Sequence, residues 1–285
     1  MLRHRLITAA ILIPFFIWVT LALPSRYFAV ITAVIVALGA WEWTGLAGLN
    51  RKWRYTGVFV TIVMMGVMAV YVIETKALYA LLGIVVIWWV AGLSWVVSYN
   101  RKPATSPCAA GAATLAGGEN RLGRAAVGLL VLVPAWTALV ALHESGVYGP
   151  NFVLFLFVLI GMADSGAYFA GRWWGKAKLM PNVSPGKTWS GVAGGLWTAL
   201  LVSVTGGVVL GLSWEETRQF TIVGLVTTAF SIVGDLLESM YKRQAGVKDS
   251  GALLPGHGGV LDRIDSITAA APLFLAGLLL AGIPN

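Results

Sequence analysis

The chain carries nine apolar stretches, each close to the roughly 20 residues that a helix needs to cross the hydrocarbon core of a bilayer. The composition agrees, because 58% of the 285 residues are apolar and only 11% are charged, too few to cover a surface that faces water. A soluble enzyme, a disordered chain and a small disulfide-stabilised domain are therefore excluded. The expected spans are Leu6–Leu23, Tyr27–Leu49, Tyr55–Ile73, Ala77–Ser98, Leu122–Leu142, Asn151–Ala170, Trp189–Leu212, Phe220–Leu237 and Ile267–Ile283.

The basic residues predict the orientation of these spans. With nine spans and a cytoplasmic N-terminus, 17 of the 20 Lys and Arg residues fall on the cytoplasmic side, and only Arg26, Lys76 and Arg218 fall on the other. Cytoplasmic loops of membrane proteins carry such an excess of positive charge. We therefore expect an all-α polytopic integral membrane protein with about nine transmembrane helices and a cytoplasmic N-terminus. The net charge of +8 is explained by these loops, so no nucleic-acid partner is expected.

The polar segments suggest two units. Residues 99–121, rich in Ala, Gly and Thr, predict a cytoplasmic linker between about four N-terminal spans in residues 1–98 and about five C-terminal spans in residues 122–285. The C-terminal unit contains the long cytoplasmic loops 171–188 and 238–266, and all five aspartates of the chain lie in this unit. We therefore expect the C-terminal unit to be the catalytic one.

The segment from Ser239 to Asp265 has the composition of a phosphoryl- or nucleotidyl-transfer site. Its basic side chains can bind phosphate oxygens, its clustered glycine amides can receive them, and its carboxylates suit Mg²⁺. A basic loop with glycine turns and internal ion pairs would have the same composition. For His257, a role as a proton carrier and a role as a structural hydrogen-bond donor are equally good interpretations. The candidates in and beside this segment are Asp235, Ser239, Lys242, Arg243, Lys248, Asp249, His257, Gly258, Gly259, Asp262, Arg263 and Asp265.

Three carboxylates within predicted spans need a polar cavity or a partner. Asp235 lies near the cytoplasmic end of the eighth span, on one helical stripe with Glu238, Ser239 and Lys242. Asp164 lies near the same end of the sixth span, where a structural pair with Arg172 or Lys178 is the alternative. Glu42 stands alone between two tryptophans, and an interfacial or structural role is the better interpretation.

A second polar segment, SPGKT, contains Ser184, Lys187 and Thr188. It is not a P-loop, because that motif needs glycine where this chain has Pro181. A lysine and two hydroxyls at the membrane surface suit a lipid phosphate or a nucleotide. A plain turn at the entry to a helix is the alternative.

Together these residues resemble the phosphatidate cytidylyltransferases, also called CDP-diacylglycerol synthases, of the bacterial type. The family pattern is S-x-(apolar)-K-R-x4-K-D-x-(small)-x2-(apolar)-P-x-H-G-G-(apolar)-x-D-R-(apolar)-D. Tyr241 departs from it, since the family prefers an aliphatic residue or Phe there. The pattern is matched by Ser239, Lys242, Arg243, Lys248, Asp249, Gly251, Leu254, Pro255, His257, Gly258, Gly259, Val260, Asp262, Arg263, Ile264 and Asp265.

The resemblance implies an enzyme of phospholipid biosynthesis that makes CDP-diacylglycerol and pyrophosphate from CTP and phosphatidate. It implies Mg²⁺, with K⁺ as a possible second cation, a homodimer, and an active site on the cytoplasmic side of the bacterial inner membrane. Asp235 and Asp262 are the implied metal ligands. The implied catalytic residues are Asp235, Lys242, Arg243, Lys248, Asp249, His257, Asp262, Arg263 and Asp265. The implied substrate-binding residues are Asp164, Ser184, Lys187, Thr188, Ser239, Gly258 and Gly259.

Two other functions fit parts of the sequence. Another metal-dependent transferase acting on a lipid phosphate would also use acids and a cation at the cytoplasmic face. A membrane transporter would use carboxylates within its spans. The transporter fits less well, because the polar residues gather near the cytoplasmic ends of the spans.

Overall fold

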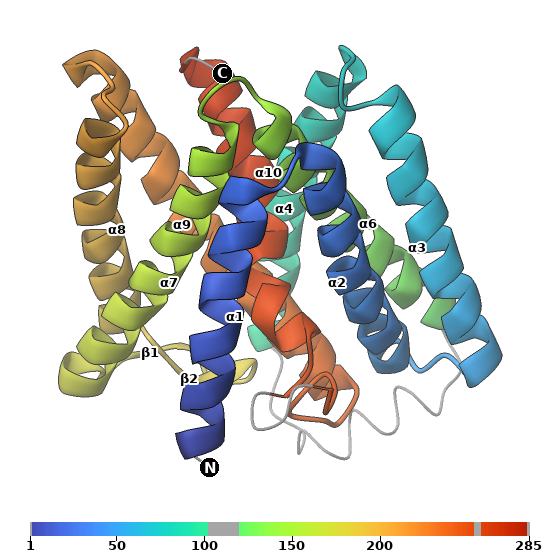
Figure 1. Cartoon of the computed structure of the whole chain (residues 1–285). Helices are drawn as coiled ribbons and strands as arrows, with labels where there is room; N and C mark the ends of the chain where they lie inside the picture. Colours follow the sequence, from blue (N-terminus) through green and yellow to red (C-terminus); the bar gives the residue numbers. More distant parts are fainter. Residues whose placement is uncertain (1, 102–119, 254–257, 284–285) are drawn as a thin grey trace.

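The computed structural model describes residues 2–101, 120–253 and 258–283. These residues form nine long helices and one small β-hairpin (Figure 1). Each helix corresponds to one of the nine expected spans. The helices are α1 Leu2–Ala22, α2 Ser25–Leu46, α3 Arg51–Tyr71, α4 Ala77–Asn100, α6 Arg121–Glu144, α7 Gly149–Trp174, α8 Trp189–Val209, α9 Trp214–Gln244 and α10 Leu261–Ala281.

The helices form a bundle that fits an integral membrane protein. Eight of those in the described residues are long and apolar enough to cross a membrane, and the ninth, α1, has 21 residues with a shorter apolar part at Ile13–Ala22. The chain enters the bundle at one end with α1 and leaves it at the other with α10, as an odd number of spans requires (Figure 1). The expected fold class, an all-α polytopic membrane protein, is confirmed.

The polar loops are shorter than expected because the flanking helices continue into them. Helix α9 runs for 31 residues, about 46 Å at the helical rise, and so exceeds the hydrocarbon thickness. Its last turns and the first turns of α10 hold most of the candidate residues between Ser239 and Asp265. Loop 171–188 contains an antiparallel hairpin of β1 Lys178–Met180 and β2 Ser184–Thr188. Most of the expected linker, residues 102–119, lies outside the described residues.

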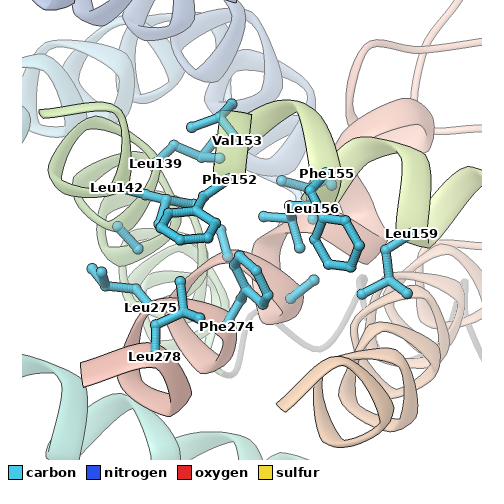
Figure 2. Packing of buried hydrophobic residues seen from close by; sticks show 14 of the residues in the cluster. Leu139, Leu142, Phe152, Val153, Phe155, Leu156, Leu159, Phe274, Leu275 and Leu278 are labelled. Atoms are coloured by element: carbon cyan, nitrogen blue, oxygen red, sulfur yellow. The ribbon is translucent and has the colours of Figure 1, made fainter. Parts of the chain in front are cut away.

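Helices of both expected units share the buried core. One cluster joins residues of α6, α7 and α10, with Phe155 and Phe274 stacked at 5.7 Å between ring centroids (Figure 2). A second cluster lies around Trp43, Trp89 and Tyr241, which come from α2, α4 and α9. Helices α2 and α4 therefore contact the C-terminal helices directly and help to position them.

Small residues allow the closest helix contacts. A Cβ atom added at Gly166 of α7 would overlap Thr198 of α8 and come within 2.9 Å of the Gly194 carbonyl oxygen. A Cβ atom at Gly234 of α9 would come within 2.6 Å of the Asp265 carbonyl oxygen of α10. Close backbone approach of this kind is a main source of helix association in membranes. At Gly234 the close approach of the two backbones brings Asp235 and Glu238 of α9 near Asp265 of α10.

These contacts predict different effects for two glycines of α7. Gly166→Ala forces α7 and α8 apart and should destabilise the protein by about 1–3 kcal/mol. Gly161→Ala meets nothing within 4 Å and gains helix propensity, so its stability should be unchanged or higher. Thermal unfolding in detergent measures both. Equal melting temperatures for the two variants would contradict this packing.

Candidate active site

Three carboxylates meet where α9 and α10 pack together. Asp235 and Glu238 lie one helical turn apart on α9, and Asp265 lies in the second turn of α10. Each offers one oxygen, and these oxygens lie within 4.8 Å of one another. The Glu238 side chain is 2% exposed, and within the described part of the chain its Oε1 atom accepts no hydrogen bond from an N–H or O–H donor, while its carboxyl group lies within hydrogen-bonding range of Asp265. Carboxylates this close in a buried place are stabilised by compensating positive charge or by a shared proton.

Lys242 supplies part of this compensation. Its Nζ atom donates to Glu238 Oε2 at 2.7 Å and to Asp262 Oδ1 at 2.8 Å, and the lysine side chain is 10% exposed. Asp262 also accepts from the backbone N–H groups of Ser250, at 3.0 Å, and Gly259, at 2.7 Å. Asp262 thus joins α9, the loop before α10 and the first turn of α10.

The hairpin brings a second lysine to the acids. Lys187, on β2, forms an ion pair with Asp235 at 2.6 Å, and both side chains are about one quarter to one third exposed. The opposite oxygen of Asp235 accepts a hydrogen bond from Ser239 at 3.2 Å. The Arg243 guanidinium donates to the Val183 carbonyl oxygen at 3.3 Å and so ties the hairpin to α9.

The remaining predicted residues that the structure describes lie around this centre. Thr188 is the N-cap of α8, where its hydroxyl accepts from the Gly191 N–H at 3.1 Å. Asp164, on α7, is exposed and lies within electrostatic range of both Asp235 and Lys187.

Gly258 has a φ of +82°, which favours glycine. Ser184 is half-buried on β2, and Lys248, Asp249 and Arg263 are exposed near the site. His257 lies outside the described residues.

The charges of this centre point to cation and phosphate chemistry. With every group ionised, the four acids Asp235, Glu238, Asp262 and Asp265 exceed Lys187 and Lys242 by two negative charges. A divalent cation would balance this excess. The partly exposed Lys187 lies beside the acids and can exchange its carboxylate partner for a phosphate oxygen. Metal-assisted transfer of a phosphoryl or nucleotidyl group needs this combination.

Glu238 is a member of this group of acids that the sequence did not single out as a candidate. Glu238 follows Asp235 by three residues, so the two share one face of a helix. This spacing was the only feature of the sequence that linked Glu238 to the candidate residues. The proximity of Glu238 to Asp265 depends on how α9 and α10 pack. Asp262, which stays an expected metal ligand, accepts hydrogen bonds from three protein groups, and the oxygens of Asp235, Glu238 and Asp265 lie within 4.8 Å of one another.

Comparisons with known proteins agree with this chemistry. The chain is 41% identical over 283 residues to a phosphatidate cytidylyltransferase of Pseudomonas aeruginosa, covering 99% of this chain and 98% of that protein. It is 36% identical over 296 residues to a protein of the same name from Haemophilus influenzae, covering 96% and 97%. A third, from Brucella suis, is 46% identical over 143 residues, covering 47% and 49%. Residues 3–280 match the cytidylyltransferase family, and the chain therefore belongs to that family.

Proposed function

We propose that this protein transfers the cytidylyl group of CTP to phosphatidate, giving CDP-diacylglycerol and pyrophosphate for phospholipid synthesis. The observation that carries the proposal is the group of acids and lysines where α9 and α10 meet, in a chain that matches the family over nearly its full length. The names of its relatives from Pseudomonas aeruginosa and Haemophilus influenzae supply the lipid acceptor.

The reaction is an in-line displacement at the α-phosphorus of CTP. An oxygen of the phosphatidate phosphate forms a bond to that phosphorus. The bond from the α-phosphorus to the oxygen that bridges to the β-phosphate breaks, and its electron pair leaves with pyrophosphate. Because the attacking oxygen is already anionic, no general base is needed. The protein has to align two polyanions and offset their repulsion.

The lysines and arginines divide this work. Lys242 is buried between Glu238 and Asp262, so its role is to hold the acids in place. Lys187 is partly exposed on the hairpin, and its ammonium group leaves Asp235 to bind a phosphate oxygen of the substrate. Lys248 and Arg263 are exposed near the site and add positive charge for the triphosphate. Arg243 keeps the hairpin in position.

Mg²⁺ fits the acid cluster. Asp235, Glu238 and Asp265 would hold it, and the distance of at most 4.8 Å between their oxygens supports this ligand set. When bound, Mg²⁺ supplies positive charge that neutralises phosphate oxygens. If Asp164 is counted, five carboxylates exceed the two paired lysines by three charges, which one divalent cation and one K⁺ would balance.

We place the protein in a bacterial inner membrane, with this site facing the cytoplasm and a homodimer as the working form. The excess of Lys and Arg on the predicted cytoplasmic side supports the orientation, as does the cytosolic location of CTP. Helix α3 buries only Thr61 and Met65 in the described structure, which leaves an apolar face for lipid or a second subunit.

Purified protein in mixed micelles should release pyrophosphate only when CTP, phosphatidate and Mg²⁺ are all present. The lipid product, identified by mass spectrometry, should be CDP-diacylglycerol. Each component is omitted in turn, and other nucleotides and lipid phosphates replace CTP and phosphatidate. Turnover with another lipid acceptor but none with phosphatidate would contradict the proposal.

Glu238→Gln should reduce kcat by about 100-fold or more, because it removes one of three charges from the cation site. It should also raise the Mg²⁺ concentration needed for half-maximal rate. Glu215→Gln is the matched control, since Glu215 lies at the other end of α9 and pairs with Arg218 on the surface. Equal Mg²⁺ dependence in both variants would exclude Glu238 from the cation site.

Lys187→Met should raise the KM of a substrate by about tenfold or more while the protein stays folded, since it removes a charge-assisted bond to phosphate. Lys178→Met on the neighbouring strand, where the lysine is exposed, provides the control. Steady-state kinetics with CTP and phosphatidate varied separately would show which phosphate Lys187 binds. Unchanged KM values for both would remove Lys187 from the site.

A further inference from the structure

Glu42 of α2 holds the loop that leads into α10, although 208 to 219 residues separate it from its partners. Its carboxylate accepts hydrogen bonds from the Ser250 hydroxyl at 3.0 Å, the Val260 N–H at 3.1 Å and the Leu261 N–H at 2.8 Å. Glu42 is 5% exposed. The sequence predicted only an interfacial or structural role for this acid.

Two of these contacts cap a helix. Helix α10 begins at Leu261, and Val260, its N-cap residue, makes no side-chain cap bond of its own. The first N–H groups of a helix have no partner within it, and a carboxylate there also interacts favourably with the helix dipole. Glu42 provides from another helix what an Asp or Ser at the cap position would normally provide.

The loop leaves room for this carboxylate only because two of its residues are glycines. A Cβ atom at Gly251 or at Gly259 would overlap the Glu42 carboxylate, and one at Gly259 would also overlap the Ser250 hydroxyl. Since neither glycine has a φ in the left-handed region, the close approach is the reason for glycine here. The loop backbone is thus fitted closely around Glu42.

Residues of the same loop also donate hydrogen bonds to Asp262, at the start of α10. The Ser250 hydroxyl donates to Glu42, and the Ser250 N–H donates to Asp262. The Gly259 N–H also donates to Asp262, which accepts from Lys242. The hydrogen bonds of Glu42 in the described residues go to Ser250, Val260 and Leu261, which lie in the loop and at the start of α10. Its position is therefore transmitted through the loop and through the first turn of α10.

We propose that Glu42 is a positioning residue for cytidylyl transfer: it caps α10 from α2 and fixes the loop that sets Asp262 and Asp265 in place. This inference rests on the proposed function for its kinetic consequence. It gives the N-terminal helices a part in the active site, beyond membrane anchoring.

Glu42→Gln tests the proposal. The glutamine amide has one acceptor oxygen where the carboxylate has two, and its NH₂ group faces N–H or O–H donors. We expect kcat to fall by about 10- to 100-fold, with a higher Mg²⁺ requirement, as for residues that orient metal ligands. Hydrogen exchange at the backbone amides of residues 249–253 and 258–265 should become faster, while α6 and α7 keep wild-type exchange rates.

Two further variants make the test specific. Ser250→Ala removes one contact of Glu42, and its effect should be less than additive with that of Glu42→Gln in a double-mutant cycle. Thr32→Val is the control, because Thr32 is buried on α2 and donates only within that helix in the described structure. It should leave kcat and exchange near wild type.

The exchange measurement separates the two hypotheses. If the wild-type protein shows no turnover but protection of the loop still depends on Glu42, the proposed function is contradicted and the positioning of the loop by Glu42 is not. Wild-type protection of residues 249–253 and 258–265 in the folded Glu42→Gln protein would overturn the positioning role. So would faster exchange spread equally over all helices, or full additivity with Ser250→Ala.

Discussion

Repulsion between carboxylates is the interaction on which the site depends. Asp235, Glu238 and Asp265 lie too close together, and Glu238 too deeply buried, to be stable as free anions. Lys187 and Lys242 offset part of the negative charge, and the cation that the site is proposed to bind offsets the rest. Because the backbones of α9 and α10 meet at Gly234, the acids are already close together before a substrate arrives. This is the preorganised electrostatic arrangement that phosphate transfer requires.

The rest of the fold holds this arrangement from three directions. The hairpin between α7 and α8 delivers Lys187, and Arg243 anchors it to α9. The loop before α10 is fixed between Asp262 on one side and Glu42 on the other. Helices α2 and α4 reach this end of the bundle through the core around Trp43, Trp89 and Tyr241. Helices α2 and α4, which precede the expected linker, are thus packed against α6, α9 and α10.

Much of this could be predicted from the sequence, because hydropathy and charge are local properties. All nine spans correspond to helices, and the motif from Ser239 to Asp265 points to the family by its residues alone. Helix ends were less accurate, since α9 and α10 extend into polar segments by satisfying their own backbone hydrogen bonds. The hairpin was not predicted, because SPGKT contains no alternation of apolar and polar residues.

Contacts between distant parts of the chain could not be predicted from the sequence. Glu42 was one acid between two tryptophans, and nothing local connects it to Val260 or Leu261. Glu238 shared a stripe with Asp235, but only the packing of α10 shows that Asp265 joins them. The expected pair of Asp235 and Asp262 came from a motif, which cannot show that protein donors surround Asp262.

The most direct test of the central claim is the position of a bound cation in the active protein. Crystals grown with Mn²⁺ and CTP, in conditions where turnover has been demonstrated, would locate the ion by its anomalous scattering. The account predicts a peak bounded by Asp235, Glu238 and Asp265, at the junction of α9 and α10. A peak elsewhere, or none in crystals of active protein, would contradict it.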